Sequence, residues 1–209
     1  VKVRLGQRVK AQDLLAVGFD EVILATGIVP RVPDIPGIDH PKVMGYLDAI
    51  LERQPVGKSV AVIGAGGIGF DVSELLTHSG KSSSLDTETF WKEWGIDLGL
   101  EARGGVEGIQ PQPTAAARQV YLLQRKKSKV GAGLGKTSGW VHRAGLRMKQ
   151  VKMIPAVEYL RIDDEGLHIS VAGNAPQVLP VDNVILCAGQ TPLRELQGEL
   201  EANGVTVHL

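Results

Sequence analysis

Cysteine is almost absent from this 209-residue sequence, in which Cys187 is the single example. One cysteine cannot close an internal disulfide, and it provides no cluster for zinc or for iron and sulfur. No apolar run approaches the ~20 residues of a membrane-spanning helix, and no signal peptide is recognisable. We therefore expect a cytoplasmic protein with no metal site in this chain, in which Cys187 is a small buried filler.

Net charge is also lacking, because 23 Lys and Arg residues balance 23 Asp and Glu residues. A neutral chain has no global attraction to nucleic acid or to an anionic membrane. The local distribution is uneven, since residues 108–157 contain no acid but ten cations. These are Arg118, Arg125, Lys126, Lys127, Lys129, Lys136, Arg143, Arg147, Lys149 and Lys152. Such a segment predicts an anionic ligand or partner. No nucleic-acid motif is present, so the phosphates of a dinucleotide explain the basic segment more simply than nucleic acid does. A coenzyme A tail and an acidic neighbouring domain are further candidates.

A glycine-rich turn is the most informative feature that is present. Residues 60–63 form a short, wholly apolar run, which is typical of a parallel strand buried on both faces. Gly64, Gly66 and Gly69 follow with G-x-G-x-x-G spacing, and residues 72–76 have helical character. In a dinucleotide-binding turn these glycines permit the tight turn, admit the pyrophosphate and let the helix pack on the strand. We expect the positive end of this helix to face the phosphates.

The next apolar strand, residues 120–123, ends in a basic segment that includes Arg125 and Lys126. At this position an acid holds the ribose hydroxyls of NAD, whereas arginine accommodates the extra phosphate of NADP. The segment therefore favours NADPH. Two alternatives stay open. Asp86 and Glu88 lie nearer the usual ~20-residue interval for the acid, although they follow a run of serines that is poor strand material, and residues 125–129 are also compatible with a solvated charge run.

The other elements complete an α/β fold with a Rossmann-like parallel sheet and an antiparallel β-meander crossover. Residues 151–154 are expected as a parallel strand, residues 157–162, 167–171 and 178–181 as the meander, and residues 184–189 as the strand that closes the domain. We also expect strands at residues 1–5, 19–24 and 205–209, and helices at 11–16, 43–52 and 140–146. Residues 81–119 are a long insertion. Burial of Phe90, Trp91 and Trp94 is expected to hold this insertion in place.

Five stretches of the chain carry a family resemblance: residues 19–31, 35–43, 64–71, 123–126 and 134–143. Together they resemble flavoproteins that have two dinucleotide-binding domains. More narrowly, they are similar to bacterial NADPH-dependent 2,4-dienoyl-CoA reductases. The similarity covers nearly the whole chain. Residues 134–143 are its most specific part, because more distant relatives need not contain this motif.

The resemblance implies a fold of the FAD/NAD(P)-binding flavoprotein type. In this family NADPH gives hydride to FAD, and electrons pass through a 4Fe-4S cluster to FMN. FMN then reduces the dienoyl thioester in the beta-oxidation of unsaturated fatty acids. The barrel that holds FMN and the cluster is missing from this chain, as is the rest of the FAD domain. We therefore expect both as partners, no catalytic residue within the chain, and no activity of the chain alone.

The resemblance also implies domain boundaries. Residues 1–40 correspond to part of the FAD-binding domain, residues 41–57 to a linker and helix, residues 58–190 to the NADPH-binding domain with its insertion at 81–119, and residues 191–209 to the return into the FAD domain. Carried over by position, the NADPH site comprises Gly64, Gly66, Gly67, Gly69, Arg125, Lys126, Trp140 and Arg143. The residues that would face FAD are Val9, Ala25, Thr26, Gly27 and Gly189.

Two other functions compete with this hypothesis. The first is a non-catalytic nucleotide-binding module, because the chain lacks every substrate-reducing group. The second is a related flavoprotein of the NADH oxidase or amine dehydrogenase type, which would use another electron acceptor. The motif at residues 134–143 argues against the second.

Overall fold

The computed structural model describes all 209 residues, which divide into two compact units. The small unit consists of Val1–Pro30 together with Gln190–Leu209, and the large unit of Arg31–Gly189. None of the helices combines the length and apolar character that crossing a bilayer requires.

A five-stranded parallel sheet forms the centre of the large unit. Its strands, in spatial order, are β3 (Val43–Gly45), β10 (Asn183–Leu186), β4 (Ser59–Ile63), β5 (Gln119–Leu123) and β6 (Lys152–Ile154). Every neighbouring pair is parallel. The predicted α/β class with a Rossmann-like parallel sheet is therefore confirmed.

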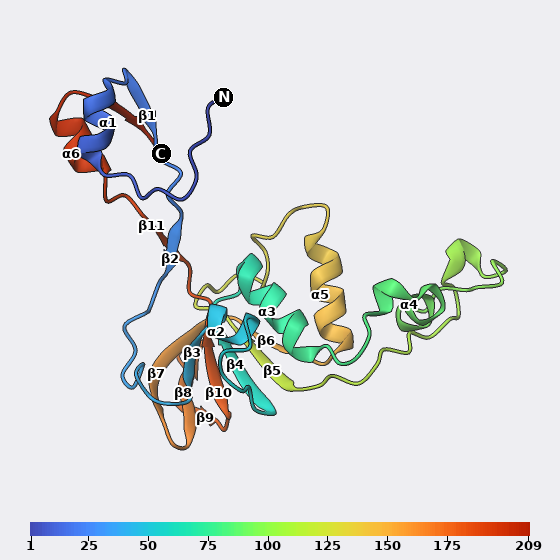
Figure 1. Cartoon of the computed structure of the whole chain (residues 1–209). Coiled ribbons are helices and arrows are strands. Elements are labelled where there is room, and N and C mark those ends of the chain that lie inside the picture. The colour runs from blue at the N-terminus through green and yellow to red at the C-terminus, as the bar shows by residue number, and fades with distance from the viewer. The chain divides into compact units, whose positions relative to one another are not determined.

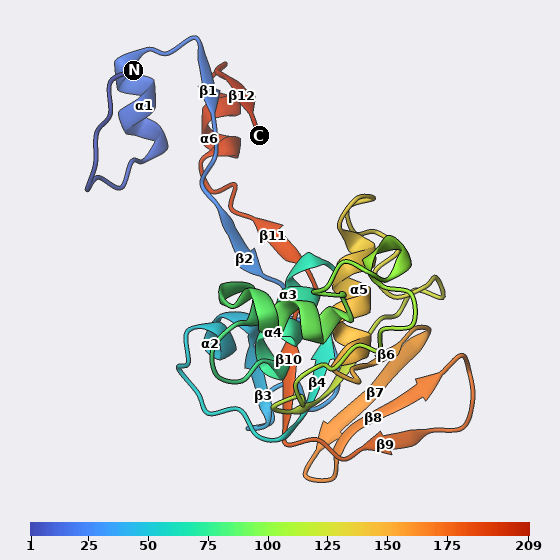
Figure 2. The same cartoon turned by 90° about the vertical axis from the view of Figure 1, so that its right-hand side faces the viewer.

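Alternating side chains of the central strand enter two separate cores. Val60 and Val62 pack with the helices α2 (Tyr46–Ile50), α3 (Gly67–Thr77) and α5 (Gly139–Met148). Ala61 and Ile63 pack with the meander β7 (Val157–Asp163), β8 (Gly166–Val171) and β9 (Gln177–Leu179). Figures 1 and 2 show α3 and α5 on one face of the sheet and the meander on the other. Since both faces are covered, β4 needs a continuous apolar run. The predicted antiparallel meander is also confirmed.

Two sequence-based assignments are wrong. Residues 43–52 were expected to form one helix, but β3 occupies the first part and α2 begins only at Tyr46. The cause is tertiary, because Val43 pairs with Val184 of β10 and so becomes the edge of the sheet. Residues 1–5 form no strand. Their alternating pattern has no neighbouring strand with which to form hydrogen bonds.

The insertion contains η1 (Ser83–Leu85), α4 (Thr87–Trp94) and η2 (Arg103–Gly105). None of the three aromatic residues expected to be buried is fully so: Trp91 and Trp94 are half-buried, and Phe90, 6.1 Å from Trp94 between ring centroids, is exposed. The buried side chain of α4 is Glu93. Its Oε1 accepts hydrogen bonds from the Thr114 hydroxyl at 2.8 Å and from Lys149 Nζ at 2.9 Å. An ion pair thus attaches the insertion to the end of α5.

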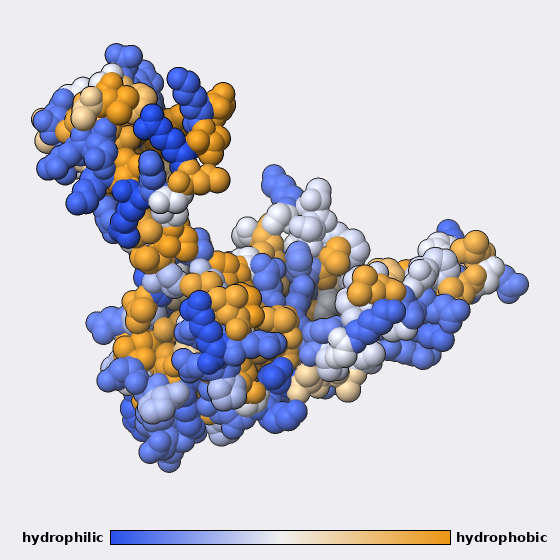
Figure 3. All heavy atoms as spheres, viewed as in Figure 1, coloured by the Kyte–Doolittle hydropathy of each residue, from blue (hydrophilic) through white to orange (hydrophobic).

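The small unit has short elements around a small core. They are α1 (Ala11–Val17), β1 (Glu21–Ile23), β2 (Ile28–Pro30), β11 (Gln190–Pro192), α6 (Gln197–Ala202) and β12 (Thr206–His208). β1 pairs in parallel with β12, and β2 pairs antiparallel with β11. Ala11, Leu24 and Leu200 are buried, whereas Ile23 is 77% exposed. Apolar surface of this unit is visible as orange spheres at the upper left of Figure 3.

Candidate dinucleotide-binding site

Loops from three parallel strands meet at the carboxyl edge of the sheet in the large unit. The N–H of Gly64, just after β4, donates to the carbonyl of Leu123 in β5 at 3.0 Å. The N–H of Cys187, just after β10, donates to the carbonyl of Ile63 at 2.8 Å. In an open α/β sheet, this edge is where ligands bind. The candidate site is built from the segments that follow β4 and β5, together with α5.

The first and third glycines of the turn are positions of close packing. Gly64 has a φ of +110°, and a Cβ built on it would lie 2.2 Å from the carbonyl oxygen of Cys187. A Cβ on Gly69 would lie 1.8 Å from the carbonyl oxygen of Gly64. Only glycine fits at either position without a backbone shift. Cys187 is buried, which raises the pKa of its thiol to about 12, so the thiol stays protonated.

The middle of the turn is open. A Cβ on Gly66 or on Gly67 would meet no atom within 4 Å, and both residues are exposed. Gly66 is the N-cap of α3, and no side chain caps this helix end. The first amides of α3 and its positive dipole end therefore face free space. A pyrophosphate fits this arrangement, since it needs close backbone approach and amide donors.

The basic loop, which we define as residues 124–129, follows the neighbouring strand β5. Arg125, Lys126, Lys127 and Lys129 are all exposed, and none forms an ion pair with an acid. The rival acids lie elsewhere, because Asp86 caps α4 with a 2.9 Å hydrogen bond from Thr89 N–H and Glu88 belongs to the same helix. The segment next to the glycine turn therefore offers unpaired positive charge and no carboxylate.

Helix α5 contributes the remaining predicted residues. Trp140, in its first turn, is 59% exposed. Arg143 Nη1 donates to the carbonyl of Gly131 at 2.9 Å, which ties α5 to the glycine-rich segment before it. A 2.7 Å contact between His142 Nδ1 and Glu74 Oε1 joins α5 to α3. Sequence reasoning missed this contact, because nothing in the local pattern pairs two residues so far apart in the chain.

The residues predicted to face FAD fall into two groups. Val9 and Thr26 lie in the small unit and line a cavity of about 660 Å³ there, with Gly6, Gln7, Arg8, Leu193 and Glu195. Ala25 and Gly27 flank Thr26, whose hydroxyl donates to the carbonyl of Leu193 at 2.6 Å. The small unit has no G-x-G-x-x-G turn. Gly189 belongs to the large unit, where its carbonyl accepts from the N–H of Arg31 at 2.9 Å.

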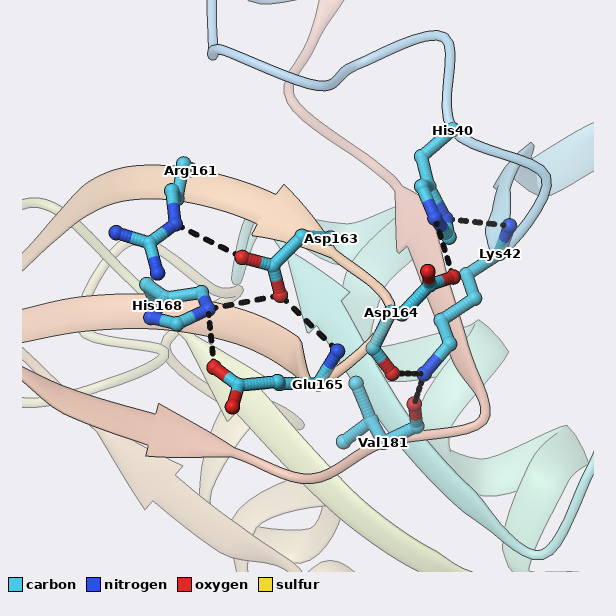
Figure 4. Close-up of polar contacts among 8 residues, drawn as sticks. All are labelled: His40, Lys42, Arg161, Asp163, Asp164, Glu165, His168 and Val181. Atoms are coloured by element: carbon cyan, nitrogen blue, oxygen red, sulfur yellow. Dashed lines mark hydrogen bonds and ion pairs between the residues drawn. The ribbon is translucent and has the colours of Figure 1, made fainter.

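A polar cluster at the turn between β7 and β8 also contains groups of the kind that ligate metals. Ligand-type atoms of Asp163, Glu165 and His168 lie within 4.8 Å of one another (Figure 4). They are already engaged, because the Asp163 carboxylate accepts from Arg161 Nε at 2.8 Å and lies 2.8 Å from His168 Nε2. These hydrogen bonds lower the pKa of Asp163 well below its usual range. We attribute the cluster to the geometry of the turn.

Together, the parallel sheet, the tight glycine turn and the open helix end define a nucleotide-binding protein of the FAD/NAD(P)-dependent type. A family comparison agrees: the pyridine nucleotide-disulphide oxidoreductase model matches residues 1–208. The chain belongs to this family of oxidoreductases. Membership of this family indicates that flavin and nicotinamide cofactors are used.

The individual proteins that this chain resembles share about a third of its residues or fewer over the matched regions. A metal reductase of Desulforamulus reducens is 28% identical over 88% of this chain, and an NADH oxidase of Enterococcus faecalis is 34% identical over 33% of it. The matched region is 26% of the metal reductase and 17% of the NADH oxidase. The solved structure of a 2-naphthoyl-CoA reductase covers all of this chain with a TM-score of 0.66 at 20% identity, and the chain covers 26% of it. The chain thus spans about a quarter of the length of the metal reductase that it matches.

Proposed function

We propose that this chain is the NADPH-binding portion of a flavoprotein that passes hydride from NADPH to FAD and so reduces 2,4-dienoyl-CoA thioesters. One observation carries the nucleotide assignment. The open turn at Gly66 and Gly67 follows β4, and the loop of unpaired cations follows the neighbouring strand β5. Pyrophosphate and 2'-phosphate are the two anionic groups of NADPH. The site offers helix amides for the former and Arg125 with Lys126 for the latter.

The remaining residues have supporting roles in this proposal. Gly64 and Gly69 shape the turn, while Trp140 and Arg143 border the nucleotide on the α5 side. Residues 58–190 then form the NADPH-binding domain, and residues 1–40 and 191–209 belong to the FAD domain. Val9, Ala25, Thr26, Gly27 and Gly189 would face FAD, which supplies a hydride acceptor when bound. The chain holds nicotinamide in place for a nearly unimolecular transfer. The barrel domain, with its FMN and 4Fe-4S cluster, would be supplied by a part of the protein outside residues 1–209.

Replacing Gly66 with alanine separates binding from folding. Its φ of −83° and ψ of −172° suit any residue, and the new methyl group meets no protein atom within 4 Å. Because Gly66 is the N-cap of α3 and alanine caps a helix less well than glycine, we expect the free energy of unfolding to fall by no more than about 1 kcal/mol. NADPH affinity should fall about tenfold or more, or ~1.4 kcal/mol, because the methyl group occupies the space of the pyrophosphate. Calorimetric titration and urea unfolding measure the two effects. Unchanged affinity would show that the pyrophosphate does not cross this turn.

Removing both Arg125 and Lys126 side chains tests the choice of nucleotide. Each charge-assisted bond to phosphate is worth at least about 1.5 kcal/mol, so the loss of two should weaken NADPH binding by about 3 kcal/mol or more, which is over 100-fold. NADH affinity should stay the same, because NADH has no 2'-phosphate. Arg103→Ala, which removes an exposed cation from the insertion, is the control for net charge. Tighter binding of NADH than of NADPH by the unmodified protein would contradict the assignment.

The substrate is the most specific part of the proposal, and one observation supports it. The motif at residues 134–143 is similar to that of 2,4-dienoyl-CoA reductases. A solved structure that shares the fold is that of a 2-naphthoyl-CoA reductase, and at 20% identity this likeness concerns the fold alone. Similarity to an NADH oxidase and to a metal reductase favours a different electron acceptor as the second candidate. Turnover of a 2,4-dienoyl-CoA by the full-length protein decides between them. Activity on another acceptor alone would overturn our choice.

A further inference from the structure

The side chain of Gln124 closes the backbone of the basic loop. Its Nε2 donates to the carbonyl oxygen of Lys126 at 3.0 Å and to that of Ser128 at 2.8 Å. The N–H of Ala156 donates to the same Lys126 carbonyl at 3.0 Å. No other hydrogen bond holds the main chain of residues 125–128. The shape of this turn therefore depends mainly on one glutamine.

Gln124 is itself firmly placed. Its main-chain N–H donates to the carbonyl of Ile154 at 3.0 Å, and its carbonyl accepts from the N–H of Val157 at 3.0 Å. Both partners belong to the end of β6 and the start of β7, which border the large core. The Gln124 side chain thus connects the main chain of the basic loop to a residue that is itself fixed by hydrogen bonds at the edge of the sheet.

The cations of the loop have no such support of their own. The Arg125 and Lys126 side chains are exposed and contact no acid, so their positions follow from the path of the main chain. Charges held in place before a ligand arrives bind it more tightly, because less conformational entropy is lost on binding. A turn closed by Gln124 would hold the main chain that carries Arg125 and Lys126, at the end of the strand that neighbours β4 and its glycine turn.

We propose that Gln124 is a positioning residue that sets the preference of the site for nucleotides with a 2'-phosphate. The inference rests on the proposed NADPH function and extends it to a residue that touches no nucleotide in that scheme. Gln124 acts through Arg125 and Lys126, by fixing the main chain that carries them. Its loss should therefore affect the 2'-phosphate and leave the rest of the nucleotide unaffected.

The test uses the full-length protein and two probes, adenosine 2',5'-bisphosphate and AMP, which differ by the 2'-phosphate alone. Gln124→Met keeps the length of the side chain and removes both donors. Affinity for the bisphosphate should fall about tenfold, in line with two neutral hydrogen bonds, while affinity for AMP stays unchanged. Gln124→Asn, whose shorter amide cannot reach both carbonyls, should give the same result and decides the question if the methionine variant does not fold.

Gln119→Met is the matched control, since Gln119 lies at the opposite end of β5 and donates to the Tyr121 hydroxyl at 2.9 Å. It should change neither affinity. Equal losses for both probes, or no loss for the bisphosphate, would overturn the role of Gln124. The Arg125→Ala variant distinguishes a failure of the Gln124 positioning role from a failure of the NADPH assignment. If it weakens the bisphosphate and the Gln124 variants do not, the positioning role alone fails, whereas no effect of Arg125→Ala removes the NADPH assignment itself.

Discussion

Gly64→Ala is expected to destabilise the large unit by about 4 kcal/mol, which combines backbone strain with overpacking. The φ of +110° at this residue is unfavourable for any side chain, and the new Cβ would lie 2.2 Å from the Cys187 carbonyl oxygen. Cys187 directly follows β10, and the contact is with its main chain, so no side-chain rotation relieves it. The turn must move, and Gly69 must move with it, because the backbone of Gly69 packs against the Gly64 carbonyl. NADPH binding should be lost together with the stability.

Gly67→Ala is the control within the same turn. Gly67 is the first residue of α3, and an added Cβ meets nothing within 4 Å. Alanine there should leave the free energy of unfolding unchanged or raise it by up to about 1 kcal/mol, because alanine favours the helix. Urea unfolding followed by circular dichroism compares the two variants. Equal stability of the Gly64 and Gly67 variants would show that the turn is less tightly packed than the structure indicates.

The glycine turn and the parallel strands were predictable because their signals are local. A strand buried on both faces needs a continuous apolar run, and residues 60–63 have one. The three glycines act at fixed separations along a single turn. Residues 43–45 behave differently, since their pairing with β10 depends on residues about 140 positions later in the chain. No window of sequence around Val43 contains that information.

The acid-free segment at 108–157 was informative but overstated the charge that is available to a ligand. Arg118 Nε donates to the carbonyl of Gly57 at 3.0 Å, and Lys152 Nζ lies 5.0 Å from the centre of the Tyr121 ring. Lys149 forms the ion pair that anchors the insertion. These cations serve the fold. Four cations without an acidic partner lie in the basic loop, whereas Lys136 and Arg147, which are also exposed and unpaired, lie outside it. Composition alone could not separate these groups.

The attachment of the insertion was not predictable, because a glutamate between two tryptophans reads as a surface charge. Its partner Lys149 lies 56 positions further along the chain. The Glu93 side chain is only 10% exposed, so burial alone would raise its pKa, but hydrogen bonds from Ser83, Lys149 and Thr114 outweigh burial and lower the pKa to about 2. A buried charge that is well paired makes the contact specific, and losing one partner leaves the other uncompensated.

Acid should therefore detach the insertion from α5. The pKa of Glu93 is lowered in the folded state from an ordinary value of 4.5, so its contribution is complete above about pH 4.5 and is lost as the pH falls towards 2. The shift corresponds to up to about 3 kcal/mol. Glu93→Gln should weaken the contact by a similar amount at pH 7 and remove its pH dependence. Native-state hydrogen exchange of the α4 amides, corrected for the intrinsic effect of pH, measures both.

Glu88→Gln provides the comparison on the same helix. The Glu88 side chain is 76% exposed and lies 3.9 Å from Lys92, a surface pair that should contribute less than about 0.5 kcal/mol. Its removal should leave α4 protection and the acid response unaltered. If the Glu88 and Glu93 variants lost protection equally, or if the Glu93 variant kept the pH dependence of the unmodified protein, the anchor would have to lie elsewhere. The expected difference arises from environment alone, since both residues are glutamates on one short helix and only Glu93 is buried against Lys149.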